Sequence, residues 1–163
     1  MFRKGTLDDA AAMARIFNYY VANSDVIFSE RILTEDDMRR KLSSLGVAER
    51  FPFIIAEMPD GRMGGYGYAH LYHPDPVYGQ TWELTIYLDH ECLGQGIGSE
   101  MLRRLVAACR AAGAHALISC ITGGNTACER MHIRQGFFEA GRLRAVGFKF
   151  GSYLDDVIYE IVF

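Results

Sequence analysis

The sequence predicts a mixed α/β fold (α+β), with helices on both faces of a central, largely antiparallel sheet. Residues 82–88 alternate between apolar and polar side chains with the two-residue period of a strand. Residues 101–109 instead place apolar side chains three and four positions apart, which is the pattern of a helix with one buried face. With the flanking segments, the predicted order is strand, two helices, three strands, helix, strand, helix and two strands.

Local signals define these elements along the chain. The expected strands cover residues 2–6, 52–57, 63–72, 82–88, 116–121, 137–150 and 153–163. Two helices are expected to start at pairs that resemble capping boxes, which are Thr6 with Asp9 and Thr34 with Asp37. The Asp60-Gly61 turn predicts a hairpin, and the glycines at 64, 65 and 67 indicate a bulge or a close backbone approach in its second strand. Gly136 is expected to cap the last helix.

The composition suits one domain, and we assign residues 1–163 to it. Of the 163 residues 50% are hydrophobic, which is enough for a sizeable core. The formal charge of −3 gives no broad basic surface, so no nucleic-acid partner is expected. Asp8 and Asp9 follow the basic N-terminus before any apolar run. We therefore expect no secretory leader, no membrane segment and a cytoplasmic location.

The four cysteines are expected to be reduced thiols in or beside the core. They are Cys92, Cys109, Cys120 and Cys128. Their spacing lacks the close pairs of a zinc site, so no bound metal is expected. Cys120 or Cys128 could act as a covalent acyl carrier, but no base is identifiable beside either, which favours packing.

A glycine-rich turn separates the central strand from its helix. Such a turn exposes the free N–H groups of a helix start, where phosphates commonly bind. A P-loop is excluded because no lysine precedes Ser99, and a dinucleotide fingerprint fits poorly because the glycines fall at every second position. The segment Leu93-Gly94-Gln95-Gly96-Ile97-Gly98 resembles the coenzyme A loop of the GNAT acyltransferases, with Leu93 where Gln or Arg is usual.

The resemblance to the GNAT N-acetyltransferases covers essentially the whole chain. It rests on the element order, the glycine loop, Asn125 and Gly136-Phe137, and it implies a GNAT-like sheet. Further segments resemble the phosphinothricin acetyltransferase branch, which acetylates the α-amine of small amino-acid analogues such as phosphinothricin or methionine sulfoximine. These segments are residues 16–21, 81–87, 130–132 and 147–151, followed by Leu154-Asp155.

The resemblance implies acetyl-CoA as co-substrate. Backbone groups of the central strand and Asn125 would bind the pantetheine arm, and the glycine loop would bind the pyrophosphate. The implied residues are Ile86, Tyr87, Leu88, Leu93, Gly94, Gln95, Gly96, Ile97, Gly98, Ser99, Asn125 and Cys128. Cys128 stands where the branch often has serine, and a thiol is the weaker hydrogen-bond donor.

The resemblance also assigns the proton transfers to Glu83 and His132. The chemistry asks for such groups, because an amine with a pKa of about 8 to 10 must lose a proton before it attacks a thioester. We expect Glu83 to act as base and His132 as the acid for the departing thiolate, although the opposite assignment stays open. Without the resemblance, Glu83 also fits a structural strand carboxylate and His132 a core histidine.

Four residues are candidates for contact with the acceptor: Phe28, Asp75, Tyr78 and Lys149. Tyr78 matches an aromatic residue near the acceptor amine in the branch. Asp75 and Gly79 stand where the branch usually has arginine, and an acid there would favour a cationic or neutral amine over an anionic one. Phe28 also fits a loop aromatic packed on the core, and Lys149 also fits a strand cap.

Three functions are consistent with these residues. The leading hypothesis is an N-acetyltransferase that moves the acetyl group of acetyl-CoA to the amine of a small amino acid or analogue by direct attack. The alternatives are an acetyltransferase for a protein N-terminus or a ribosomal protein, with an open peptide groove, and a non-catalytic acyl-CoA-binding module. The resemblance further implies a homodimer through the C-terminal strands.

Overall fold

One mixed sheet organises the chain in the computed structural model, which describes residues 1–47 and 49–163. The strand order is β1-β2-β3-β4-β5-β7-β6, and every pairing is antiparallel except that of β4 with β5. The strands are β1 (Phe2–Lys4), β2 (Phe53–Glu57), β3 (Met63–Leu71), β4 (Thr81–Leu88), β5 (Ala116–Thr122), β6 (Phe138–Lys149) and β7 (Ser152–Val162). The helices are α1 (Ala10–Asn23), α2 (Glu35–Ser44), α3 (Ile97–Ala111) and α4 (Thr126–Arg134). The predicted fold class and element order are confirmed.

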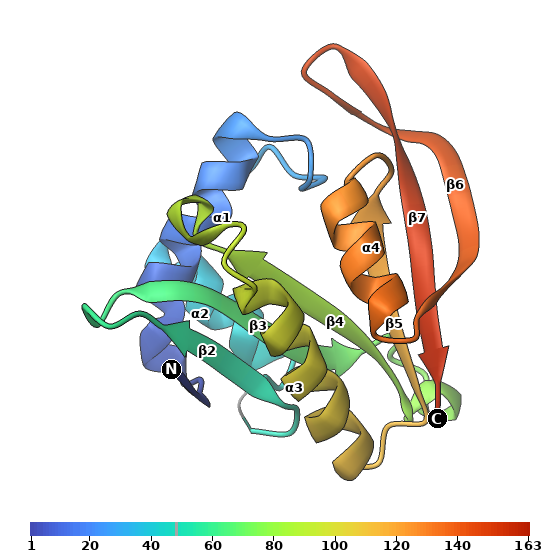
Figure 1. Ribbon diagram of the computed structural model, residues 1–163, viewed down its shortest axis with the longest axis horizontal. Helices are drawn as coiled ribbons and strands as arrows, with labels where there is room; N and C mark the ends of the chain where they lie inside the picture. The colour runs from blue at the N-terminus through green and yellow to red at the C-terminus, as the bar shows by residue number, and fades with distance from the viewer. Residues whose placement is uncertain (48) are drawn as a thin grey trace.

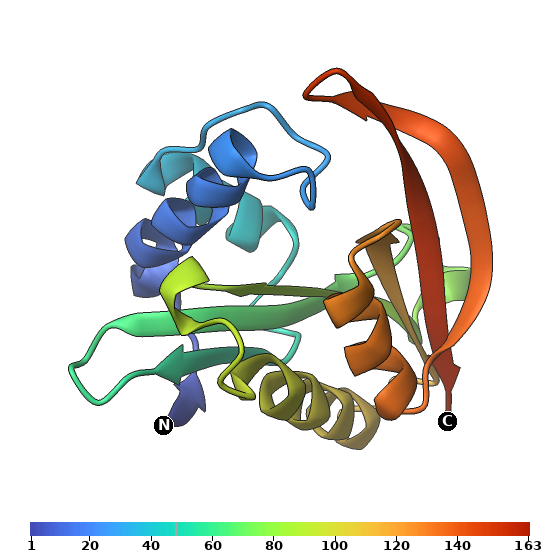
Figure 2. The same ribbon diagram turned by 45° about the horizontal axis from the view of Figure 1, so that its top comes forward.

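Helices cover both faces of the sheet, as Figures 1 and 2 show. The apolar sides of α1 and α2 pack on the face that carries the buried Tyr66 and Tyr68 of β3. The apolar side of α3, together with α4, packs on the opposite face, against Trp82 and Leu117. The sheet therefore separates two cores, and any cavity that reaches both faces must pass between two strands.

The helix ends follow the predicted capping. The Thr34 Oγ1 atom accepts a hydrogen bond from the Asp37 N–H at 3.1 Å, and the Asp37 carboxylate accepts one from the Thr34 N–H at 3.1 Å. The Thr6 N–H donates to the Asp9 carboxylate at 2.9 Å, and a short 3-10 turn follows before α1 begins. Beyond α4, Gly136 has a φ of +92°, the left-handed conformation that glycine adopts without strain.

The glycines of β3 allow α3 to lie close to the sheet. A Cβ atom at Gly67 would lie 2.6 Å from Leu105 Cδ1 and 3.0 Å from Met101 Sδ, both on α3. The pairing of β2 with β3 also shifts register between Ala56 and Glu57. Both the close approach and the irregular register expected from these glycines are confirmed.

The two parallel strands pair only at their beginnings. Glu83 of β4 and Ile118 of β5 form the last of three residue pairs between them. Beyond that point β4 continues to pair with β3 as far as Leu88, whereas β5 continues to pair with β7 as far as Thr122. The strands therefore diverge after Glu83 (Figure 1), and we call this divergence the fork. Within the described residues, the β5-facing edge of residues 84–88 has no strand partner.

Lys149 ties the β6–β7 hairpin to the end of α1. The residue is only 4% exposed, and its ammonium donates to the backbone carbonyls of Tyr20, Ser24 and Ile27, at 3.4, 2.6 and 3.0 Å. The first carbonyl belongs to the last turn of α1 and the other two to the loop that follows. The Tyr20 carbonyl also accepts a hydrogen bond from the Ser24 N–H at 3.0 Å. The carbonyls of Ser24 and Ile27 lie beyond the helix, and this ammonium satisfies them without water.

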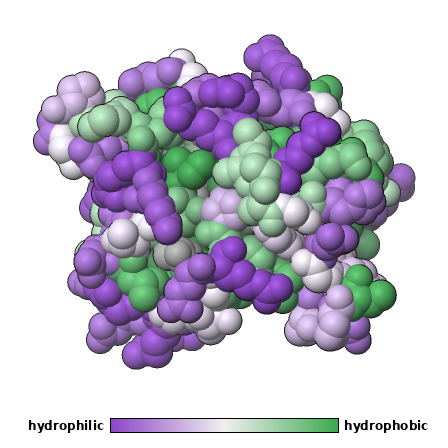
Figure 3. Space-filling model, turned by 90° about the horizontal axis from the view of Figure 1, so that it is seen from below, coloured by the Kyte–Doolittle hydropathy of each residue, from purple (hydrophilic) through white to green (hydrophobic). Residues whose placement is uncertain are grey.

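The outer surface is mixed. The face seen in Figure 3 intersperses hydrophobic side chains among hydrophilic ones. The tip of the β6–β7 hairpin is different, because Phe148, Phe150 and Tyr153 are 62%, 64% and 73% exposed. In the described part of the chain, no helix has both the length and the hydropathy needed to span a bilayer.

We expect Gly67→Ala to lower the free energy of unfolding by about 1–3 kcal/mol, because the added methyl group must displace a packed side chain of α3. Gly141→Ala is the matched control, since an added Cβ there meets no atom within 4 Å and the expected change is within about 0.5 kcal/mol. Urea unfolding measures both variants. Equal effects of the two substitutions would contradict the close approach.

We expect Lys149→Met to lower the free energy of unfolding by about 2–4 kcal/mol, because buried carbonyls lose a charged donor. Lys4→Met removes the same charge from the exposed edge strand β1 and should leave stability nearly unchanged. Urea unfolding of both variants at one pH gives the comparison. If Lys149→Met were as stable as Lys4→Met, the proposed tie between hairpin and helix would be wrong.

Candidate active site

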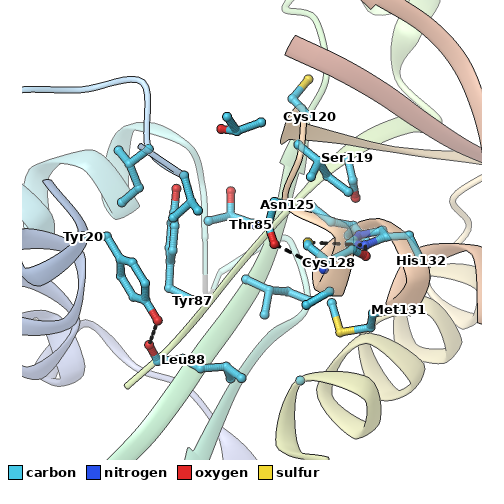
Figure 4. A pocket seen from close by; sticks show the side chains of 18 of the residues that line it. Tyr20, Thr85, Tyr87, Leu88, Ser119, Cys120, Asn125, Cys128, Met131 and His132 are labelled. Atoms are coloured by element: carbon cyan, nitrogen blue, oxygen red, sulfur yellow. Dashed lines mark hydrogen bonds between the residues drawn. The ribbon is translucent and has the colours of Figure 1, made fainter. Parts of the chain in front are cut away.

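A pocket of about 910 Å³ opens at the fork. Its walls come from β4, β5, the loop before α3, the helix α4 and the loop after α1. Figure 4 shows Tyr20 and Tyr87 on one side of this pocket and Cys128 and His132 on the other. The fork therefore joins the two faces of the sheet in a single cavity.

The glycine loop forms an open cradle at the start of α3. Gly94 and Gly96 have φ values of +75° and +79°, and a Cβ atom on either would meet no atom within 4 Å. Gly98 is tighter, since its Cβ would lie 3.2 Å from both Leu88 and Met131. The N–H groups and dipole of a helix N-terminus attract anions, so this cradle suits a pyrophosphate.

Most of the residues expected to bind the co-substrate line the pocket. They are Ile86, Tyr87, Leu88, Leu93, Gly94, Gly96, Ile97, Gly98, Ser99, Asn125 and Cys128. The side chain of Gln95 is an exception, because it is exposed and donates to the Glu91 carbonyl at 3.4 Å. The Leu88 carbonyl already accepts a hydrogen bond from the Tyr20 hydroxyl at 2.8 Å. The backbone groups of the preceding residues of β4 are therefore more available to a ligand than this carbonyl.

The groups present fit acetyl-CoA. The cradle suits its phosphates, and the unpaired edge of β4 offers backbone donors and acceptors for its amide-bearing arm. A buried hydroxyl, Ser119 Oγ, also lines the pocket and has no hydrogen-bond partner within the described residues. As for metals, the described residues bring together no group of three or more His, Cys, Asp and Glu side chains able to hold an ion.

His132 is held in one tautomer by the helix that carries it. Its Nδ1 atom lies 2.9 Å from the Cys128 carbonyl oxygen, which can only accept, so Nδ1 carries the proton and Nε2 keeps a lone pair. The Cys128 Sγ atom lies 3.7 Å from the same Nδ1. Burial lowers the pKa of His132, against the opposing effect of the carbonyl. The resting imidazole is therefore neutral near pH 7, with Nε2 able to accept a proton.

Glu83 lies at the last pair before the fork, on the face that carries α1 and α2. It is opposite His70 of β3 in the antiparallel register. Burial raises the pKa of Glu83 above the ordinary carboxyl value, and Asp156 raises it further, whereas His70 and Lys41 oppose the shift. No ion pair to Glu83 forms in the part of the chain that the structure describes. A carboxylate with a raised pKa and a free face is well suited to remove a proton.

Asp156 of β7 is a pocket residue that the sequence did not reveal. It is opposite Thr122 of β5, on the same face of the sheet as Glu83. Burial raises the pKa of Asp156 as well. The sequence predicted a strand here, but only the pairing of β7 with β5 brings this carboxyl to the pocket.

Cys120 also lines the pocket and is exposed there, while Cys128 is partly buried. The expectation of thiols in or beside the core is therefore correct for Cys92, Cys109 and Cys128, which packs against the core, but wrong for Cys120. The physical reason is the fork, which leaves this part of β5 uncovered by β4. Burial raises the pKa of Cys120 to about 12, with Glu83 and Asp156 adding to the shift, so its thiol is a poor nucleophile.

Of the residues expected to contact the acceptor, Phe28 lines the pocket, but Asp75 and Tyr78 do not. The Asp75 carboxylate accepts a hydrogen bond from the Val77 N–H at 3.0 Å in an exposed turn, and Tyr78 packs on Tyr72 with ring centroids 6.1 Å apart. Their turn precedes β4, whereas the pocket begins at Glu83 and extends away from it. In the single chain these two residues therefore lie outside the pocket, and their contact with the acceptor stays a prediction.

Lys149 is likewise not a lining residue of the pocket. Its ammonium has three protons, and it donates to three backbone carbonyls. The geometry supports a structural role in place of the expected contact with an acidic headgroup.

Comparison with known sequences agrees with this geometry. The profile of the acetyltransferase (GNAT) domain matches residues 3–158. A phosphinothricin N-acetyltransferase from Alcaligenes faecalis is 34% identical over 154 residues, which is 94% of this chain and 77% of the relative.

Solved structures agree as well. One match is a GNAT superfamily phosphinothricin acetyltransferase from Sinorhizobium meliloti in complex with AcCoA, with a TM-score of 0.94 at 28% identity. The match covers 99% of this chain and 87% of the Sinorhizobium chain. A ribosomal-protein-alanine N-acetyltransferase from Brucella melitensis matches with a TM-score of 0.93 at 31% identity and covers 100% and 99% of the two chains. This chain therefore belongs to the GNAT family of acetyl-CoA-dependent N-acetyltransferases.

Proposed function

We propose that this enzyme acetylates the amine of a small amino acid or amino-acid analogue by direct attack on acetyl-CoA. The observation that carries the proposal is the continuous pocket at the fork, which joins the phosphate cradle on one face to the carboxylate of Glu83 on the other. An amine that enters from the Glu83 side would meet the acyl donor between the strands. The relative named for phosphinothricin supports a small amino-acid-like acceptor.

Glu83 is the proposed base. An acceptor amine arrives mostly protonated, and this carboxylate can remove the proton directly or through water. His132, on the other face, is the proposed carrier of a proton to the departing sulfur. Since its Nδ1–H is directed at the Cys128 carbonyl and burial disfavours the imidazolium, Nε2 first takes up a proton and then gives it away. This sequence of transfers keeps the expected role of His132 as the acid for the departing thiolate and adds a step in which it first accepts a proton.

The acceptor end of the pocket is acidic, and we propose a neutral or cationic acceptor for that reason. Glu83 and Asp156 both contribute carboxyl groups there. The arginines that line the pocket, Arg130 and Arg134, belong to α4 on the opposite face. An anionic headgroup would meet repulsion from two carboxylates, while Lys41 and His70, which act on Glu83 electrostatically, do not line the pocket. Phosphinothricin itself therefore fits less well than a neutral or basic amino acid.

We further propose a homodimer in the cytoplasm. The exposed aromatic side chains of Phe148, Phe150 and Tyr153 on the projecting hairpin are typical of a protein–protein interface. Four free thiols suit a reducing compartment.

A second candidate acceptor is the N-terminus of a protein, because one similar structure is named as a ribosomal-protein-alanine acetyltransferase. Release of free thiol from acetyl-CoA, measured with neutral, basic and anionic amino acids and with an alanine-first peptide, separates the candidates. Turnover of single amino acids but not of the peptide supports the proposal. Turnover of the peptide alone contradicts it, and acetyl-CoA binding without turnover of any amine would indicate the non-catalytic module.

Glu83→Gln is expected to lower kcat/KM about 100- to 10,000-fold, because the variant cannot remove the proton of the amine. The wild-type profile should lose activity as pH falls through the raised pKa of Glu83, since only the ionised carboxylate is a base. This acidic limb should be missing in the variant. Glu160→Gln on β7, outside the pocket lining, is the control. A variant with wild-type turnover and an unchanged pH profile would refute the role of Glu83.

Asp156→Asn is expected to lower kcat/KM for lysine relative to norleucine by about tenfold, because a partly buried charge interaction is lost. It should raise the relative rate with phosphinothricin. Asp155→Asn is the matched control, since that neighbouring carboxylate accepts hydrogen bonds from the Ala145 N–H and from Arg142 instead of lining the pocket. An acceptor preference that is identical in wild type and Asp156→Asn would show that Asp156 does not select the acceptor.

A further inference from the structure

Ser119 occupies a distinctive place at the fork. It is the first residue of β5 beyond Ile118, the last residue that pairs with β4. Its side chain is buried, with 3% of the residue exposed, yet it lines the pocket. Its hydroxyl has no hydrogen-bond partner within the described residues.

An unpartnered hydroxyl in such a place needs a physical explanation. A buried polar group that has lost water and gained no partner destabilises the folded state, and native proteins contain few of them. Alanine would fill the same position without this loss. A ligand that supplies the missing partner explains why a serine is found here.

The neighbours of Ser119 indicate which part of the ligand its hydroxyl would contact. Leu117 and Ile121, two residues away on either side, pack in the core formed with α3 and α4, so Ser119 points to that face. Ser119 and His132 both line the pocket, and in Figure 4 they lie on the same side of it. Glu83 lies on the opposite face, so the amine approaches from one side of the fork and the leaving group departs on the side of Ser119 and His132.

We propose that the Ser119 hydroxyl donates a hydrogen bond to the sulfur of coenzyme A as that sulfur leaves. In this step the bond from the amine nitrogen to the acetyl carbon forms and the carbon–sulfur bond breaks, with its electron pair moving to sulfur. A protonated acceptor loses one proton to Glu83 before it attacks, and its nitrogen loses a second proton once the bond to carbon has formed. That second proton reaches the sulfur by way of His132, and Ser119 keeps its own proton. The hydrogen bond strengthens as charge develops on sulfur, so it favours the transition state over the bound thioester.

The proposal rests on the acetyl transfer argued above, and Ser119→Ala tests it. We expect kcat to fall about 10- to 100-fold while KM for acetyl-CoA changes little, because one hydrogen bond to a charged group is lost in the transition state. The melting temperature of the free protein should stay the same or rise by about 2–4 °C, because an unpaired buried hydroxyl is removed. Ser44→Ala, which removes an exposed hydroxyl bonded to the Lys41 carbonyl at 2.8 Å, is the control for kinetics.

Binding without turnover gives an independent readout. Calorimetry should show that the wild type binds coenzyme A more tightly than desulfo-coenzyme A, and that Ser119→Ala reduces this preference about 3- to 10-fold without changing the affinity for desulfo-coenzyme A. An unchanged preference, a kcat within twofold of wild type, or a lowered melting temperature would each overturn the proposal. If the wild type transferred acetyl to no amine, the proposed function would fail while the binding comparison still decided the contact of Ser119 with sulfur.

Discussion

The separation of β4 from β5 after Glu83 is the constraint on which the site depends. A sheet with helices on both faces has no interior space of its own, because the side chains of both cores fill it. When two neighbouring strands part, backbone groups lose their partners and a passage opens between the faces. The missing hydrogen bonds must be replaced, and a ligand with amide groups can replace them. The sheet therefore lacks some of its strand-to-strand hydrogen bonds at the place where the protein binds its ligand.

The surrounding contacts keep the fork open. Lys149 holds the loop after α1 against the β6–β7 hairpin, and Phe28 of that loop packs on Gly147 of β6. On the other face, Asn125 caps the start of α4, because its side chain accepts a hydrogen bond from the Cys128 N–H at 3.3 Å. Lys149, Phe28 and Asn125 make these contacts and take no part in the proposed proton transfers. The groups that do take part therefore remain without strong hydrogen-bond or ionic partners. Glu83, His132 and Ser119 accordingly keep a carboxylate, a lone pair and a hydroxyl available to the pocket.

The sequence was sufficient for most of the fold because its signals are local. The capping pairs, the hairpin turn, the glycine loop and the periodic faces of strand and helix each depend on residues a few positions apart. The sequence did not show that Asp75 and Tyr78 lie outside the pocket of the single chain, because the direction of a turn relative to the sheet is a tertiary property. Asp156 and Ser119 were missed for the same kind of reason. In the sequence, each looks like an ordinary strand residue. Only the strand pairing shows that β4 leaves β5 after Ile118, next to Ser119, and that β7 brings Asp156 beside Thr122 of β5.

The central claim is that acetyl-CoA binds at the fork, along the free edge of β4 and in the glycine cradle. Hydrogen–deuterium exchange with and without coenzyme A tests this most directly, because it reports on backbone amides that gain partners. The account predicts added protection in residues 84–88 and 93–99, with little change in β1 and β2. Protection confined to β1 and β2, or no protection at residues 84–88, would contradict it.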